Sequence, residues 1–196
     1  TGSDGPADTA ERLEAGEPVK WRMTSTYPST LILLGTMGKR LEEDLRTVSG
    51  GTIELKFFEP GVLAPPFETF DAVSYGAVEA GWSTPGYWAG KEPALQLFSA
   101  VPFGLSAPKC LAWYDFGGGK APFEEIYHMH NIHGIICGRT PPEPSGWFKN
   151  AFYNTEESKG LKLGVFGLGG KVLQEVGEET KLSTSGEHKR AGGRGT

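Results

Sequence analysis

The sequence has only two cysteines, Cys110 and Cys137, among its 196 residues. Two cysteines cannot build the disulfide framework that holds small secreted domains together, and they leave the redox compartment open. Basic residues are fewer than acidic ones, 19 against 24, and the formal net charge is −5. Because nucleic-acid binding needs clustered Lys and Arg at the phosphates, we expect no nucleic-acid partner.

Long hydrophobic runs are also missing. No apolar stretch approaches the roughly 20 residues of a membrane-spanning helix. The first 20 residues hold no apolar core of a signal peptide, and five of them are acidic: Asp4, Asp8, Glu11, Glu14 and Glu17. We therefore expect residues 1–17 to form a disordered leader. Residues 178–196 contain only two hydrophobic side chains, Leu182 and Ala191, and are expected to form a disordered tail.

The middle of the chain alternates between strand and helix periods. Strands are predicted at 18–26, 52–58 and 77–83. A helix opening at Ser29 or Thr30 and ending at Gly50-Gly51 is predicted from an apolar stripe of Leu31, Leu34, Leu41, Leu45 and Val48. A second helix runs from Pro65-Pro66 to Gly76. This βαβαβ order predicts an α/β fold with a parallel sheet and right-handed crossovers.

The second half repeats the alternation less regularly. Helices are predicted near 107–116, 122–131 and 170–177. Strands are predicted at 134–137, 147–152 and 161–166. We find no internal repeat.

Motifs for catalysis are incomplete. The Gly-rich segment 164–171 has neither the P-loop spacing nor the third glycine of a dinucleotide-binding fingerprint, because Val165 and Val172 occupy those positions. A metal-dependent enzyme would need the cluster His128, His130, His133 and Cys137. His128 and His130 point apart on a helix, so only His130 and His133 are predicted to share a face. We expect no enzyme, and keep this cluster as the alternative.

Two adjacent aromatic residues, Tyr87 and Trp88, follow the third predicted strand and are framed by Gly86 and Gly90. In open α/β sheets, ligands lie beyond the carboxyl ends of the strands. These rings are therefore predicted either to wall a small-molecule site or to pack in the loop.

Several segments in order resemble the solute-binding proteins of tripartite ATP-independent periplasmic (TRAP) transporters, in the branch that binds 2-oxo acids. The similar stretches run from about 20 to 177: 21–28 (WRMTSTYP), 41–51, 67–76, 87–93, 100–104, 113–119, 145–148, 159–163 and 167–170. The resemblance implies a periplasmic-binding-protein-like (type II) fold of two α/β lobes that close on a carboxylate. Residues 18–139 would form the first lobe, and 140–177 the start of an incomplete second lobe, followed by a tail unlike the family.

The resemblance also implies a function. The parent protein captures a small organic acid such as pyruvate, together with Na⁺ or Ca²⁺, and delivers it to TRAP membrane permease subunits from the periplasm. The implied ligand-contacting residues are Tyr87, Trp88, Glu143, Tyr27 and Phe103, with Glu143 as the metal ligand. Packing within the lobe is the alternative for the four aromatic residues. A homodimer is one alternative for the oligomeric state, which the sequence does not determine.

Two positions depart from the family pattern. Gly164 stands where the family places an Arg that grips the ligand carboxylate, a contact whose loss costs about 2–5 kcal/mol. Glu143 replaces a ligand-contacting amide, and would repel a carboxylate unless a cation lies between them. Arg139 is the candidate substitute cation. A weakened receptor, or a fragment without ligand, is the expectation for this chain.

Overall fold

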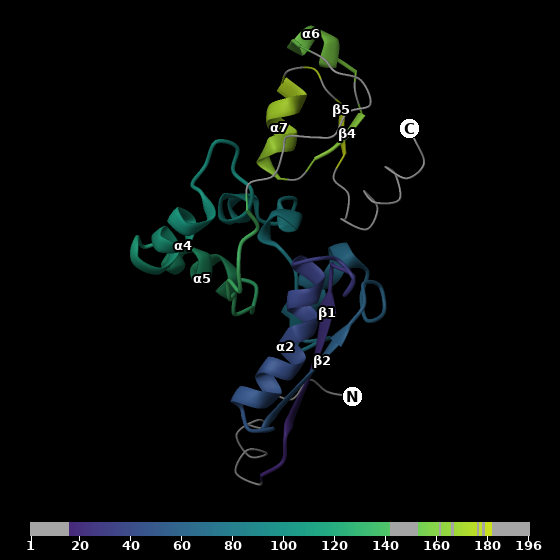
Figure 1. The fold of residues 1–196 in the computed structure, drawn as a ribbon, viewed down its shortest axis with the longest axis vertical. Helices are drawn as coiled ribbons and strands as arrows, with labels where there is room; N and C mark the ends of the chain where they lie inside the picture. Colours follow the sequence, from purple (N-terminus) through teal and green to yellow (C-terminus); the bar gives the residue numbers. More distant parts are fainter. Residues whose placement is uncertain are drawn as a thin grey trace. The chain divides into compact units, whose positions relative to one another are not determined.

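The structure is a computed structural model. It describes residues 16–141 and, between 153 and 181, all residues except 161, 166, 176 and 178. These residues fall into two compact units, one ending at Ser83 and the other beginning at Thr84. Figure 1 draws the first unit in purple and blue and the second in teal, green and yellow. The predicted lobe boundary near residue 139 stays a prediction.

The first unit contains the predicted parallel sheet. Its strands are β1 (Val19–Ser25), β2 (Ile53–Phe58) and β3 (Ala80–Trp82), in the order β2-β1-β3. Both pairings are parallel, and Met23 lies opposite Phe57 on one side and Ala80 on the other. Helix α2 (Leu34–Val48) connects β1 to β2, and the 3₁₀ helix η1 (Pro66–Glu68) with α3 (Thr69–Ser74) connects β2 to β3. The βαβαβ prediction is confirmed.

The third strand is shorter than the predicted 77–83. Gly76 ends α3 with a φ of 71°, and the N–H groups of Ala77 and Val78 both donate to the Ala72 carbonyl. These donors are used by the helix end, so the ladder with β1 starts only at Ala80.

Helix α2 lies along one face of the sheet (Figure 1). Leu41 and Leu45 pack against the buried cluster of Met23, Leu55 and Phe57, as the predicted stripe requires. The prediction that Val48 belongs to this apolar stripe is wrong, because Val48 lies in the last turn of the helix and is 83% exposed. The Trp82 ring packs against Gly38, where a Cβ would lie 2.8 Å from the ring, and its Nε1–H donates to the Leu34 carbonyl (2.6 Å).

The start of α2 also differs from the prediction. The helix begins at Leu34 rather than at Ser29 or Thr30, because residues 28–33 form a tight turn in which the Leu31 N–H donates to the Pro28 carbonyl (2.9 Å). Leu33 has a φ of 68°, a left-handed value that a branched side chain rarely adopts. No side chain caps the helix at this residue.

The opposite face of the sheet carries two buried hydroxyls without a partner in the described residues. Thr24 pairs with Gly81 across the β1–β3 ladder, and a Cβ at Gly81 would meet Cγ2 of Thr69 at 2.8 Å. Thr24 and Thr69 therefore lie on the same face as α3. Oγ1 of each is buried and makes no hydrogen bond there. An unpaired buried hydroxyl costs free energy, so neither contributes polar stabilisation.

We expect Thr24→Val to leave the free energy of unfolding unchanged or to raise it by up to about 1 kcal/mol, since valine keeps the shape without the unpaired hydroxyl. The matched control is Thr26→Val. Thr26 is as buried, but its Oγ1 lies 3.3 Å from the Trp82 carbonyl and 3.1 Å from Ser83 Oγ. That change should cost about 1 kcal/mol in urea denaturation. Equal losses in both variants would contradict the assignment.

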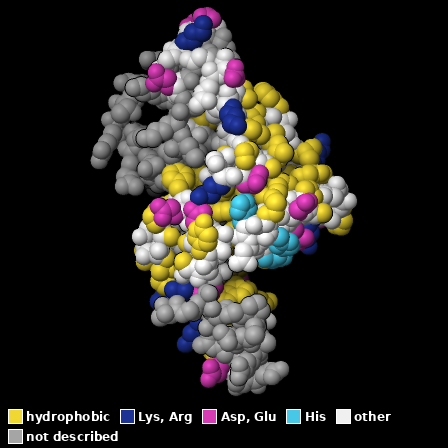
Figure 2. Space-filling view, turned by 180° about the vertical axis from the view of Figure 1, so that it is seen from behind, with side chains coloured by type: hydrophobic (Ala, Val, Ile, Leu, Met, Phe, Trp, Pro, Cys, Tyr) yellow, Lys and Arg dark blue, Asp and Glu magenta, His cyan; other side chains and the backbone are white. Residues whose placement is uncertain are grey.

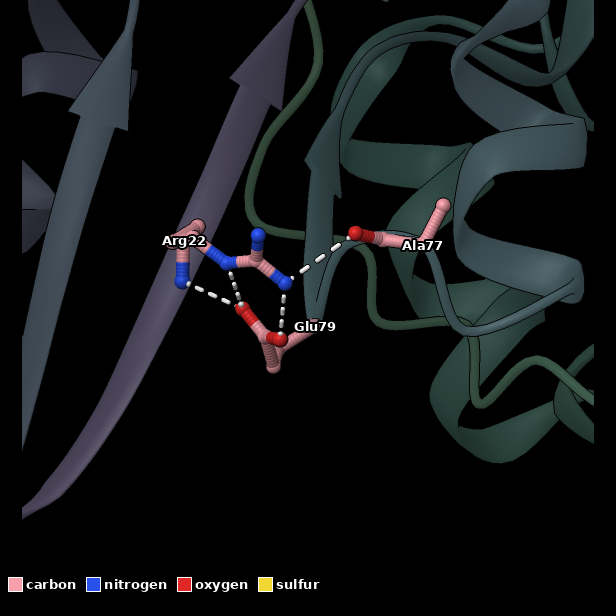
Figure 3. Close-up of polar contacts among 3 residues, drawn as sticks. All are labelled: Arg22, Ala77 and Glu79. Atoms are coloured by element: carbon pink, nitrogen blue, oxygen red, sulfur yellow. Dashed lines mark hydrogen bonds and ion pairs between the residues drawn. The ribbon is translucent and has the colours of Figure 1, made fainter. Parts of the chain in front are cut away.

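Arg22 and Glu79 form an ion pair that fixes the entry to β3 (Figure 3). The guanidinium donates to both Glu79 carboxylate oxygens (2.6 and 3.0 Å) and to the Ala77 carbonyl (3.0 Å). The Arg22 backbone N–H donates to Glu79 as well. Burial alone would raise the pKa of the Glu79 carboxyl, but the hydrogen bonds and charge of Arg22 outweigh it and hold that pKa below its ordinary value. The pair is structural.

The second unit has an aromatic core. Its first elements are the 3₁₀ helices η2 (Pro85–Trp88) and η3 (Pro93–Phe98), followed by α4 (Ala107–Phe116) and α5 (Lys120–His128). Phe123 is 2% exposed and contacts the rings of Phe98, Tyr114 and Tyr127. The predicted 107–116 helix is confirmed, and the second helix runs two to three residues earlier than 122–131.

Residues 134–137 do not form the predicted buried strand. Ile135 is 71% exposed and Cys137 is exposed. Gly134 sits against the Phe123 and Tyr127 rings, and no strand among the described residues pairs with this segment. The predicted strand at 147–152 lies outside the described residues.

The second unit also contains a two-stranded parallel sheet, with the elements α6 (Thr155–Ser158), β4 (Lys162–Gly164), α7 (Leu168–Glu175) and β5 (Glu179–Lys181). β4 pairs in parallel with β5 across α7. The tail expected from 178 onward thus contains three residues of strand, because backbone pairing needs no hydrophobic pattern over so short a length. Within the described ranges, no helix has the length and apolar character that crossing a membrane requires.

Candidate functional site

The carboxyl edge of β1 and β3 in the first unit is lined by hydroxyls, of which those of Ser25 and Thr26 belong to buried residues and that of Ser83 to a half-buried one. Ser25 and Thr26 end or follow β1, and Ser83 follows β3. Because parallel strands end at the same edge, these groups meet there: the Thr26 N–H donates to the Trp82 carbonyl (3.0 Å), and Thr26 Oγ1 contacts Ser83 Oγ (3.1 Å). Hydroxyls that both donate and accept are suited to polar ligands.

Tyr27, a predicted ligand residue, continues from this edge. It is 3% exposed. Its N–H donates to Ser25 Oγ (3.0 Å), while that hydroxyl donates to the Tyr27 carbonyl (2.8 Å). This local turn fixes the backbone at the point where the chain leaves the sheet, just before Pro28. A position for Tyr27 at the strand edge fits the predicted role, and its burial also fits core packing.

Tyr87 and Trp88 lie together in η2 of the second unit, which Pro85 opens. The rings contact edge to face, with centroids 6.2 Å apart and planes at 72°. Tyr87 is 8% and Trp88 is 3% exposed. Beside η2, Oγ1 of Thr84 lies 3.1 Å from Oγ of Ser99. The two rings thus pack together beside Thr84, which precedes η2. This arrangement is compatible both with a ligand-site wall and with packing in the loop.

Arg139, the predicted substitute cation, is bound to backbone. Its guanidinium donates to the carbonyls of Phe98 (3.1 Å) and Ser99 (2.7 Å), which end η3. A cation is favoured at a helix carboxyl end, where carbonyls lack helical partners. In this structure Arg139 therefore fixes the 134–141 segment to η3, which the sequence did not suggest.

The other predicted site residues lie apart from these. Phe103 is fully exposed in the loop after η3 and has a φ of 57°. Gly164 is an exposed residue at the end of β4, three residues before Gly167 and the start of α7. Glu143 lies outside the described residues.

The histidine cluster is arranged differently from the prediction. The imidazoles of His128 and His133 contact each other, because the chain turns back after α5. No group of three His, Cys, Asp or Glu side chains suited to a metal occurs in the described part of the chain. The four-residue cluster of the alternative, a metal-dependent enzyme, is therefore not assembled among the described residues.

Sequence reasoning missed the hydroxyl edge formed by Ser25, Thr26 and Ser83. A signal was present, since Thr24-Ser25-Thr26 closes a predicted strand whose apolar pattern stops there. Hydroxyl residues at the end of one parallel strand predict a polar edge only once the neighbouring strand is known. The partner, Ser83, could not be paired with them without the β1–β3 register.

A parallel βαβαβ sheet with a polar carboxyl edge is typical of α/β ligand-binding proteins. The model of bacterial extracellular solute-binding proteins, family 7, matches residues 24–182, and the chain belongs to this family. This is the family of TRAP solute-binding receptors, which are transport proteins and not enzymes. The match extends five residues into the tail expected to be unlike the family.

Known relatives agree with this assignment. The monocarboxylate 2-oxoacid-binding periplasmic protein of Nostoc sp. is 37% identical over 179 residues, which are 89% of this chain and 48% of the relative. A TRAP solute-binding protein from Pseudoalteromonas atlantica, solved with sodium and pyruvate, is 27% identical with a TM-score of 0.80. Another from Bordetella bronchiseptica, a mixed-occupancy dimer with calcium and picolinate, is 30% identical with a TM-score of 0.86.

The matches cover 91% of this chain but only 54% and 53% of those two solved chains. The chain thus spans about half the length of the relatives it matches. The fold assignment applies to this half, and it confirms the predicted periplasmic-binding-protein-like architecture.

Proposed function

We propose that this chain is the ligand-capturing part of a TRAP solute receptor for a small 2-oxo acid bound together with a metal cation. The observation that carries the proposal is the family's parallel sheet with a polar edge of Ser25, Thr26 and Ser83 at its carboxyl end. The Nostoc relative supports the ligand class, and the family supports a periplasmic location and delivery to a membrane permease.

The ligands of these two solved relatives share one chemical feature. Pyruvate carries a keto oxygen, and picolinate a ring nitrogen, one carbon away from the carboxylate. Either ligand can therefore close a five-membered chelate ring on a cation. Sodium accompanies one and calcium the other in those structures. The proposed ligand class for this chain is a carboxylate with a second donor on the neighbouring carbon, chelated to Na⁺ or Ca²⁺.

The proposed contacts follow from the sequence. Tyr27, Tyr87, Trp88 and Phe103 would supply apolar and phenolic surface to the ligand, and Glu143 would bind the cation. Because Gly164 replaces the family's arginine, no guanidinium at that position grips the carboxylate. The cation should then carry more of the ligand's charge than in relatives that have the arginine.

The experiment is a tryptophan-fluorescence titration of the purified chain with pyruvate. Bound metal is first removed, and the titration is then run in three samples: with added Ca²⁺, with added Na⁺ and with neither cation. Propionate is the matched control, since it has the same carbon number without the 2-oxo group. We expect saturable pyruvate binding only with a cation, and none with propionate. Cation-independent binding, equal response to propionate, or a flat response would contradict the proposal, and a flat response favours a fragment without ligand.

A gain-of-affinity variant tests the same site. Gly164→Arg should restore a charge-assisted carboxylate contact. Hydrogen bonds to charged groups are worth about 1.5–3 kcal/mol, so pyruvate binding should tighten about 10-fold or more. It should also weaken the cation requirement. Lys159→Arg, a charge-neutral arginine substitution on an exposed residue five positions earlier, is the control and should leave the affinity unchanged.

The sequence leaves a homodimer as one alternative, and the dimer of the Bordetella relative supports it. Sedimentation of the purified chain with and without pyruvate tests it.

A further inference from the structure

His128 and His133 lie against each other on the surface of the second unit. Nε2 of His128 is 3.4 Å from Nδ1 of His133, the ring centroids are 5.7 Å apart, and the planes differ by 21°. Both residues are exposed. In Figure 2 the histidine side chains gather on one face of the molecule, open to solvent.

The backbone enforces this contact. Helix α5 ends at His128, and the N–H groups of His130 and Ile132 both donate to the Tyr127 carbonyl (3.0 Å each). Asn131 takes a φ of 57°, which reverses the chain. The turn therefore returns residue 133 to the end of the helix it has just left.

The residue after His133 is held in the same way. A Cβ at Gly134 would lie 2.7 Å from the Phe123 ring and 2.8 Å from the Tyr127 ring, so the chain is seated on two buried aromatic residues. Backbone before and after His133 is thus anchored to α5. The backbone therefore brings the two imidazoles within reach of each other.

We propose that His128 and His133 form a two-imidazole site for a divalent transition-metal ion of the Zn²⁺, Ni²⁺ and Cu²⁺ class. Two nitrogens bound to one tetrahedral Zn²⁺ at about 2.0–2.1 Å are about 3.3–3.4 Å apart. The observed 3.4 Å matches this separation before any ion binds. Imidazole also suits these metals better than the oxygen-preferring Na⁺ and Ca²⁺.

Binding requires a defined tautomer of each ring. In the present contact, one of the two facing nitrogens carries the shared proton. A metal needs a lone pair on both, so neutral His128 must carry its proton on Nδ1 and neutral His133 on Nε2. Between the neutral rings this is a change of tautomer through solvent, with no net release of protons.

The protein supplies only part of the coordination shell. Among the described residues no third His, Cys, Asp or Glu completes a group around a metal, so water fills the remaining positions. Such a site is exchangeable, unlike the four-ligand sites that hold structural zinc. It is distinct from the cation that the proposed function places at the 2-oxo acid.

Calorimetric titration with Zn²⁺ at pH 7.5, in excess Ca²⁺ and without pyruvate, tests the site in His128→Gln, His133→Gln and the double variant. Two ligands held together bind more tightly than one by about 100-fold or more. Each single change should therefore weaken the site about 100-fold, and the second should add little. His130→Gln, which removes a histidine from the same turn, is the control and should retain the affinity.

Nitrogen-15 NMR of the imidazoles gives a second readout that is independent of affinity. Zn²⁺ should shift Nε2 of His128 and Nδ1 of His133, at one ion per chain. Equal losses in the His130 variant, additive losses in the two single variants, or coordination through the other ring nitrogens would overturn the proposal. Failure of pyruvate binding would leave it untouched, since the assay contains no organic acid.

Discussion

Gly35→Ala is expected to destabilise the first unit by about 3 kcal/mol, although alanine normally stabilises a helix relative to glycine by about 1 kcal/mol. Gly35 is buried in the first turn of α2. A Cβ there would overlap the carbonyl group of Pro28 and come within 3.1 Å of the Ser29 carbonyl carbon. These are backbone atoms of the turn that follows Tyr27, so they cannot rotate aside as a side chain would.

Urea denaturation followed by circular dichroism measures this loss. Gly90→Ala is the control, because a Cβ at Gly90 meets nothing within 4 Å and its φ is not left-handed. That variant should stay within about 0.5 kcal/mol of the parent. A Gly35→Ala chain as stable as the control would show that the 28–33 turn is not packed against α2. Pyruvate affinity should fall with stability, since the turn fixes Tyr27 at the edge of the sheet.

The prediction from sequence succeeded where periodicity was long and uninterrupted. The stripe containing Leu41 and Leu45 and the alternation of Ile53, Leu55 and Phe57 identified α2 and β2. Their order along the chain then determined parallel pairing, because a crossover helix leaves few other arrangements.

The prediction failed where backbone geometry overrides side-chain pattern. Leu33 adopts a left-handed φ and is the N-cap of α2, so the helix starts three to four residues later than a cap at Ser29 or Thr30 would allow. The apolar run 134–137 had the composition of a strand, but it is seated on aromatic rings at Gly134 and finds no ladder partner among the described residues. A few consecutive residues reveal neither the conformation of a turn nor whether a neighbouring strand is present to pair with them.

The site residues stay predictions, and the contacts around them could be foreseen only in part. The position of Tyr87 and Trp88 after the third strand predicted either a ligand-site wall or loop packing, and the contact between the two rings is compatible with both. The role of Arg139 could not be predicted, because its partners Phe98 and Ser99 are about 40 residues away and bind through carbonyls that carry no sequence signal. The contact of His128 with His133 likewise depends on the left-handed Asn131.

Phe123→Ala should destabilise the second unit by about 3–5 kcal/mol, the cost of removing a large buried ring from a packed core. The Phe123 ring lies 5.1, 5.4 and 4.7 Å from the centroids of Phe98, Tyr114 and Tyr127. Its loss would leave these three rings around a cavity. Phe98 also ends η3, where Arg139 is bound, so the loss should loosen the 134–141 segment too.

Phe116→Ala is the matched control in the neighbouring helix α4, because Phe116 is 91% exposed and its loss should cost no more than about 0.5 kcal/mol.

The pH dependence of the free energy of unfolding distinguishes a cavity at Phe123 from a general loosening of the second unit. Burial raises the pKa of Tyr127 far above its usual value of about 10. Above pH 10 the unfolded chain releases this proton while the folded chain keeps it, so stability falls as pH rises. A cavity that admits water should weaken this fall in Phe123→Ala. An unchanged alkaline profile, or equal losses in both variants, would contradict a core centred on Phe123.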